Sequence, residues 1–279
     1  MLALLAASTG SYRTSLETWR HDYEERLKAP QGWLSVAGLF WLHEGENRMG
    51  SDPQSDIVLP GATPRVAGTV LLHGNKAHIR TAPGVALTVN GKPDKGQDLQ
   101  PDTSAHPDTV ALGSLTMVII QRGTRTGVRL RDPESAARRQ FSGLHWFPID
   151  EQYRVRAKWH AYNPAHKISI TNVLGMTEED TTPGFAEFEL GGKSWRLEPT
   201  VEDDELFFAF RDQTSGKETY PSGRFLYADM PKNGEVILDF NKAHNPPCAF
   251  TSFATCPLPL KQNTIGVAVP AGEKRYGRH

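Results

Sequence analysis

The sequence predicts a mostly β protein of two packed β lobes with one N-terminal helix. Apolar residues follow a helical period once, near the N-terminus, and this period largely vanishes afterwards. Short β-branched and aromatic runs then alternate with Gly, Pro, Asn and Asp, which is typical of an all-β sandwich or barrel. The 25 glycines and 20 prolines also suit a turn-rich β protein better than a helical one.

Length and charge limit the possible classes of protein. The 279 residues are enough for two modest domains, and we expect a tail and helix over 1–30, a β-sandwich over 31–132 and a second β domain over 140–279. The net charge is −1 and Lys and Arg are scattered, so no basic face is available for nucleic acid. We also expect no membrane span, because no apolar stretch is long enough. The oligomeric state is left open.

The N-terminal octet MLALLAAS is apolar but has no basic residues before it. It fits the end of a truncated signal peptide, which would make the protein exported. It equally fits a frayed tail on a cytoplasmic protein. The sequence leaves both localisations open.

One amphipathic helix opens the ordered part of the chain. Leu16, Trp19, Tyr23 and Leu27 recur at helical spacing, and Pro30 ends the run. The side chains of Thr14 and Glu17 stand in the positions of a capping box. The pattern therefore predicts a helix that begins near Thr14 and buries the apolar stripe.

The first β block contains six candidate strands. They span residues 34–42, 57–59, 69–72, 77–81, 86–89 and 115–121. Within this block GENRMGSDPQSDIVLP, LTVNGKP and DTVALGS resemble the forkhead-associated domain, a β-sandwich that reads phosphothreonine. Gly50-Ser51 stands where that family has a phosphate-binding Gly-Arg, and the Ser and His of its second loop are absent from residues 64–68; only Asn90-Gly91 matches. The resemblance therefore implies the scaffold and not phosphopeptide binding.

The second β block follows a polar, Pro-containing linker at 131–139. From Tyr153 to His160 apolar and basic side chains alternate, which predicts a half-buried strand. Further strands are expected at residues 167–173, 185–190, 194–197, 206–211, 224–228 and 235–241. Gly191-Gly192 and Asn233-Gly234 are turn signals.

A hairpin is predicted from the last two of these strands. If residues 229–234 form its loop, Ala228 faces Glu235 and Arg224 lies opposite Asp239. An Arg–Asp pair at that position suits an anion or sugar hydroxyls, because Arg offers a planar fork of donors. The alternative interpretation is a structural salt bridge that orders the loop.

The segment from Asp239 to Asn263, DFNKAHNPPCAFTSFATCPLPLKQN, has neither a helical nor a strand period. A polar, proline-rich loop of this kind is more often kept for a site than for packing. Candidate ligand-binding residues in and beside it are Arg211, Tyr220, Arg224, Asp239, Asn241 and Asn245. The segment also holds Cys248 and Cys256, which form either a disulfide or two thiols.

Catalysis remains an alternative to binding. Asp239 as a general base or Cys248 as a nucleophile would make the protein a hydrolase, although a facing Arg opposes the raised pKa that a base needs. Asp239, Asn241 and His244 lack the further ligands that calcium or zinc requires, so we predict no metal site. No motif calls for a cofactor. A structural or protein-interaction module without catalysis is the third possibility.

Five blocks together resemble a bacterial family of unknown function, domain of unknown function 1684. They are GWLSVAGLFWLHEGENRMGSD, WFPIDEQYRVRA, YPSGRFLYAD, the Asp239–Asn263 segment and AGEKRY. The resemblance spans nearly the whole chain, and His244 stands where an aromatic residue is more usual. It implies no activity or catalytic residue. We therefore expect a protein that binds a small polar or anionic ligand near residues 239–256.

Overall fold

The computed structural model describes residues 2–277, with side chains from residue 10 onward. The chain divides into two compact units. One unit is Lys28–Phe141, and the other joins the first 27 residues to the chain from Ser142 onward. The prediction of a mostly β protein with an N-terminal helix is confirmed. The segment MLALLAAS was interpreted as a truncated signal peptide or a frayed tail, and its side chains lie outside those that the structure describes.

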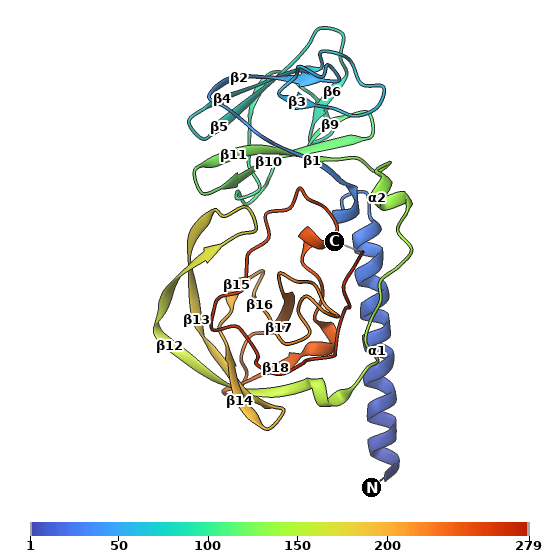
Figure 1. Ribbon diagram of the computed structural model, residues 1–279. Helices are drawn as coiled ribbons and strands as arrows, with labels where there is room; N and C mark the ends of the chain where they lie inside the picture. Colours follow the sequence, from blue (N-terminus) through green and yellow to red (C-terminus); the bar gives the residue numbers. More distant parts are fainter. Residues whose placement is uncertain (1, 278–279) are drawn as a thin grey trace. The chain divides into compact units, whose positions relative to one another are not determined.

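The unit Lys28–Phe141 is built from two sheets that share one core (Figure 1). The six-stranded sheet has the order β1 (Val36–Trp41), β11 (Arg125–Arg131), β10 (Leu115–Arg122), β9 (Val110–Leu112), β6 (Leu87–Val89) and β7 (Lys92–Pro93). The five-stranded sheet has the order β3 (Ile57–Val58), β2 (Gly45–Gly50), β4 (Gly68–His73), β5 (Lys76–Thr81) and β8 (Gln97–Leu99). Alternate residues of both sheets, such as Val70 and Ile79 opposite Met117 and Val128, fill the space between them.

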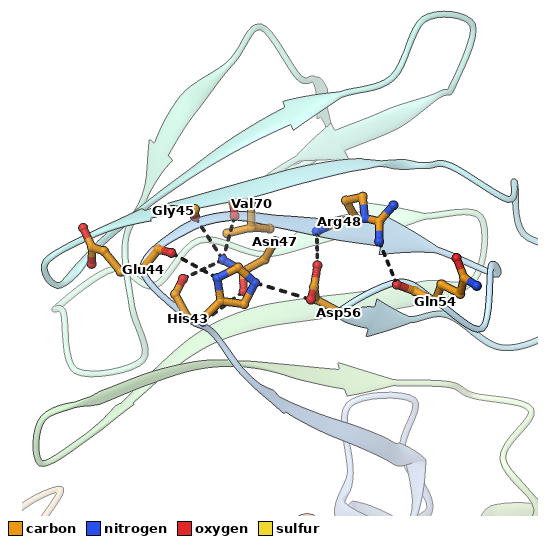
Figure 2. A network of polar contacts seen from close by, with 8 residues as sticks. All are labelled: His43, Glu44, Gly45, Asn47, Arg48, Gln54, Asp56 and Val70. Carbon is orange, nitrogen blue, oxygen red and sulfur yellow. Dashed lines mark hydrogen bonds and ion pairs between the residues drawn. The ribbon is translucent and has the colours of Figure 1, made fainter.

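A buried amide organises the entry to β2, as Figure 2 shows. Asn47 is fully buried; its Oδ1 accepts from the backbone N of His43, and its Nδ2 donates to the carbonyl oxygens of His43, Gly45 and Val70. Every polar atom of this side chain therefore has a partner, which is what allows it to replace an apolar core residue. The cluster holds the β1–β2 connection in place. The resemblance to the forkhead-associated domain stays a prediction.

In the other unit a sheet of order β14 (Lys193–Leu197), β13 (Thr177–Leu190), β12 (Arg154–Thr171), β18 (Glu235–Asp239) curls around the core. Figure 1 shows the long, bent pair β12 and β13, whose register shifts between Ala161 and His166. A second sheet has the order β15 (Thr200–Glu202), β16 (Glu205–Phe210), β17 (Arg224–Asp229). The predicted alternation from Tyr153 is confirmed, because Val155, Ala157 and Trp159 pack into the core while Arg154 and Arg156 are exposed.

Helix α1 (Leu2–Lys28) packs on this unit through the predicted stripe. Leu16 and Leu27 are buried, while Trp19 and Tyr23 stack on each other and contact the Trp146 ring. The predicted start is wrong: the helix continues before Thr14, whose hydroxyl bonds back to the carbonyl of Gly10 instead of capping. The reason is that each further residue adds a helical hydrogen bond and no proline precedes Thr14, so the helix extends through Gly10 and Ser11. No described helix is both long and apolar enough to cross a membrane.

The unit Lys28–Phe141 ends with α2 (Ala136–Arg139), which is capped by the Ser135 hydroxyl. Glu24 of α1 accepts from the backbone N of Leu144 and from the indole of Trp146, at 3.3 Å in both cases. The first residues after this unit therefore run beside α1.

The predicted hairpin between β17 and β18 is wrong. Strand β17 pairs with β16, and β18 pairs with β12, so Arg224 lies opposite Phe210 and Asp239 opposite Arg154. The turn is the two-residue loop Asn233-Gly234, closed by Lys232 and Glu235, and not the six-residue loop 229–234. Beyond this bridge the backbone of Phe225 in β17 exchanges both hydrogen bonds with His244, so the segment that follows β18 lies beside β17 in its place.

Candidate functional site

Asp239 and Asn241 stand where β18 ends and the Pro-rich segment begins. Asp239 is the N-cap of the 3-10 turn Phe240–Lys242, and its carboxylate accepts from the backbone N of Asn241 at 3.2 Å. An Asp at this position satisfies a backbone donor that the turn leaves unpaired. Both side chains are buried and are held by the backbone conformation of the segment.

Tyr12 of α1 completes this arrangement from the other end of the chain. Its hydroxyl donates to the Asp239 carboxylate, 2.9 Å from Oδ1 and 3.0 Å from Oδ2, and accepts from Nδ2 of Asn241 at 3.1 Å. Burial, and then the charge of Asp239, raise the pKa of the Tyr12 hydroxyl, so it remains a donor. The guanidinium of Arg154 lies 5.6 Å from the centre of the Tyr12 ring.

Asp150 joins the same group through its backbone. Nδ2 of Asn241 donates to the Asp150 carbonyl at 2.8 Å, and the Asp150 N donates to Oδ1 of Asn241 at 3.1 Å. We call Tyr12, Asp150, Asp239 and Asn241 the Tyr12–Asp239 cluster. It ties three distant parts of the chain together at one point, so its members hold fixed positions relative to one another.

A cavity of about 510 Å³ borders this cluster. The cavity is lined by Gly10, Tyr12, Arg13, Pro148, Ile149, Asp150 and Glu151. Arg13 and Glu151 are exposed, and the guanidinium of Arg20 beside them donates to the carbonyl oxygens of Phe147 and Asn241, at 3.2 and 3.3 Å. Cationic and anionic groups thus share one hollow, next to Asp239.

Arg224 lies elsewhere, and its predicted pairing with Asp239 is wrong. Its side chain is 0% exposed; one terminal nitrogen donates to the Asp212 carboxylate at 2.7 Å and to the Val269 carbonyl oxygen at 2.9 Å, and the other donates to the Ala271 carbonyl oxygen. Burial lowers the pKa of the guanidinium, and the facing Asp212 opposes that shift. The alternative interpretation, a structural salt bridge between Arg224 and Asp239, has the wrong partner as well, because the buried ion pair is formed with Asp212.

The remaining candidates occupy other places in the same unit. Nδ2 of Asn245 donates to the buried Glu273 at 2.6 Å, and the hydroxyl of Tyr220 donates to the Cys248 carbonyl at 3.1 Å. Arg211 is exposed just after β16. The structure therefore brings Asp239 and Asn241 together, and it separates them from the other four predicted residues. In the described part of the chain no three His, Cys, Asp or Glu side chains gather as a metal site would need.

None of the seven residues that line the cavity was predicted as a site residue; the four with polar side chains are Tyr12, Arg13, Asp150 and Glu151. Asp150 and Glu151 belong to the block WFPIDEQYRVRA, so a signal for them existed in the family resemblance. Tyr12 gave no signal, because it precedes the recognised helical stripe and its partner lies 227 positions away.

Comparisons with known proteins give a family but no activity. The chain is similar to an uncharacterized protein of Haloarcula marismortui, whose structure was solved by NMR in solution, with 32% sequence identity. The match covers 49% of this chain and 78% of the archaeal one, with a TM-score of 0.42. The curated proteins contain no match. The model of DUF1684, described as a protein of unknown function, matches residues 139–274. Over residues 139–274 the chain belongs to the DUF1684 family.

Proposed function

We propose that the protein binds a small polar ligand with one anionic group in the cavity beside the Tyr12–Asp239 cluster. The observation that carries the proposal is that this cavity of about 510 Å³ borders a fully hydrogen-bonded cluster of Tyr12, Asp239 and Asn241. A wall held by such bonds is preorganised, so little conformational entropy is lost when a ligand binds.

The charges around the cavity indicate the ligand chemistry. Arg13 lines it and Arg154 lies over the Tyr12 ring; both are exposed and offer guanidinium forks for a carboxylate or phosphate. Asp150 and Glu151 are far from Arg13 in the sequence but line the same cavity. Their carboxylates accept hydrogen bonds from hydroxyl or ammonium groups. A ligand with an anion at one end and donors at the other fits both sets.

Asp239 and Asn241 have a supporting role in this proposal. They orient the Tyr12 hydroxyl and the backbone of Asp150, while Arg13 makes the anion contact first assigned to Arg224. No described histidine hydrogen-bonds to Asp239 or Cys248 to serve as a catalytic partner, which favours binding over hydrolysis. The hydrolase alternatives stay predictions. The non-catalytic interaction module likewise stays a prediction.

Thermal shift and NMR titration test the proposal with inorganic phosphate, glycerol 3-phosphate and glucose as probes. We expect glycerol 3-phosphate to stabilise the protein and to move the signals of residues 10–13 and 148–151. Arg13→Gln should weaken its binding about tenfold, the usual effect of losing one charge-assisted hydrogen bond. Arg156→Gln is the matched control, because Arg156 is also exposed but pairs with Glu235 outside the cavity lining.

Two results would overturn the proposal. The first is that no probe at millimolar concentration shifts the melting temperature or the cavity signals. The second is that Arg13→Gln and Arg156→Gln weaken binding equally, which would make the effect one of net charge alone.

A further inference from the structure

The two cysteines lie against each other in the segment Asp239–Asn263. Cys248 belongs to the 3-10 turn Pro247–Ala249, and its backbone N donates to the sulfur of Cys256 at 3.1 Å. Neither is in a disulfide; Cys256 is buried and Cys248 is half-buried. Pro247 precedes Cys248 and Pro257 follows Cys256, so a proline restricts the backbone next to each cysteine.

The surroundings of Cys248 stabilise its thiolate. The Cys256 thiol hydrogen-bonds to the Cys248 sulfur, the Tyr220 hydroxyl is a second donor, and together they lower the pKa of Cys248 against the opposing effect of burial. The Tyr220 hydroxyl has a single proton, which goes to the Cys248 carbonyl oxygen 3.1 Å away when Cys248 is a thiol and turns to the sulfur when Cys248 is a thiolate.

The roles of the two sulfurs differ because their exposure differs. Attack on an external disulfide requires access and thiolate character, and Cys248 has both. Cys256 is buried, so a large reagent does not reach it, but its sulfur lies 3.1 Å from the backbone N of Cys248. Cys248 therefore fits the role of the attacking cysteine, and Cys256 that of the resolving cysteine.

We propose that Cys248 and Cys256 form a reversible intramolecular disulfide by exchange with a small-molecule disulfide such as oxidised glutathione. The Cys248 thiolate attacks one sulfur of the reagent, forms a mixed disulfide and expels one glutathione thiolate. Cys256 then gives its proton to solvent and attacks the Cys248 sulfur, which expels the second glutathione thiolate. The protein loses two electrons and two protons, and one oxidised glutathione becomes two reduced molecules.

Tyr220 is a positioning residue in this scheme. Tyr220→Phe keeps the ring and removes one donor to the thiolate, so the pH midpoint for alkylation of Cys248 by iodoacetamide should rise. Cys256 and Tyr220 face the Cys248 sulfur directly, and the charge of Arg275 acts on Tyr220. Tyr162→Phe is the control, since that hydroxyl bonds to Glu198 instead. A midpoint that is equal in both variants would remove Tyr220 from the scheme.

Intact mass spectrometry of the full chain with oxidised glutathione tests the disulfide itself. We expect a product two hydrogens lighter than the starting protein, reversed by dithiothreitol and monomeric on a non-reducing gel. Cys256→Ser should instead trap one glutathione on Cys248, and Cys248→Ser should react much more slowly. A wild-type chain that keeps both thiols, retains a stable glutathione adduct or forms linked dimers would overturn the proposal. The wild-type result tests the proposal by itself, even if a serine variant fails to fold.

Discussion

Glu273 is the residue that fastens the Asn-Pro-Pro turn to the C-terminal part of the chain. It is 0% exposed, and its two oxygens accept from the backbone N of Asn245 at 2.8 Å and from Nδ2 of Asn245 at 2.6 Å. Burial raises the pKa of Glu273 to about 8, although the two hydrogen bonds from Asn245 act against that shift. The carboxyl group is thus protonated near neutral pH.

Glu273 should make the protein less stable as the pH rises. Its pKa is about 8 in the folded state against an ordinary 4.5, so its contribution is fully present below pH 4.5 and is lost as the pH rises through 8. We expect Glu273→Gln to remove this dependence, on the order of 3 kcal/mol between pH 5 and pH 8. Urea unfolding at both pH values measures it, with the exposed Glu218→Gln as control. Parallel pH profiles for the wild type and Glu273→Gln would contradict the expectation.

His244 should have the opposite effect, in acid. Its ring packs against Tyr23 and Tyr227, with centroids 4.8 and 6.0 Å away, and burial lowers its pKa to about 4 from 6.5. A base whose folded pKa is depressed stabilises the fold above pH 6.5 and loses that contribution as the pH falls through 4.

His244→Phe should therefore remove an acid-sensitive group while it keeps an aromatic ring in place. Between pH 7 and pH 5 the wild type should lose about 2 kcal/mol more unfolding free energy than the variant. Chemical denaturation at the two pH values gives this difference. The exposed His21→Gln should behave like the wild type, and if His244→Phe does so too, His244 is not the source of the acid sensitivity.

The site could be predicted from the sequence only where local chemistry marked it. Asp239 and Asn241 are predicted as site residues because a polar, aperiodic segment follows a strand, and both belong to the Tyr12–Asp239 cluster. Their contact with Tyr12 depends on how α1 packs, which no local pattern of residues encodes. Arg224 was assigned by a hairpin register, and its actual partner Asp212 belongs to a loop that carried no strand signal.

At the scale of elements, strand positions were easier to predict than strand partners. The strands β4, β5, β10, β16 and β17 were expected within one or two residues of their bounds. Strand β2 was missed, since GENRMG offers one large apolar side chain and its core position is taken by the amide of Asn47. The partners of β17 and β18 are β16 and β12, which lie far from them along the chain and which no local residue pattern specifies.

Gly272 shows how two elements depend on the absence of a side chain. Its φ is +79°, and a Cβ there would meet the carbonyl oxygen of Ala243 and lie 2.7 Å from that of Phe240. Gly272→Ala adds backbone strain to this clash, so we expect a loss of about 3 kcal/mol or more. Gly234→Ala has a similar φ of +76° but open space, and should cost about 1 kcal/mol. Equal losses in urea unfolding would show that the clash is relieved by movement of the loop.

At the scale of the molecule, the unit Lys28–Phe141 interrupts the chain between α1 and the rest of its own unit. Its first and last strands, β1 and β11, pair with each other, and Nε of Arg138 donates to the carbonyl of Lys28. The two ends of the unit are therefore adjacent. Its core is complete within its own two sheets, as independent folding requires.

A fragment of residues 28–141 should consequently fold alone and unfold in one cooperative transition. The bounds predicted from the sequence, 31–132, omit the Arg138 bond to Lys28 and the Ser135 hydroxyl bond to the Leu34 carbonyl at 2.6 Å. Each such bond contributes about 1 kcal/mol, so the shorter fragment should be less stable by about 2 kcal/mol.

Circular dichroism and urea unfolding of the two fragments decide where this domain ends. A Ser135→Ala change in the longer fragment is the matched control, because it removes the cap of α2 and the bond to Leu34 without shortening the chain. If Ser135→Ala makes the fragment 28–141 about as stable as the fragment 31–132, the hydrogen bonds of Ser135 account for the stability that the polar linker contributes. If both fragments are equally stable without the change, residues 133–141 only connect the units. If neither fragment folds, the unit Lys28–Phe141 needs the rest of the chain in order to fold and is not an independent folding domain.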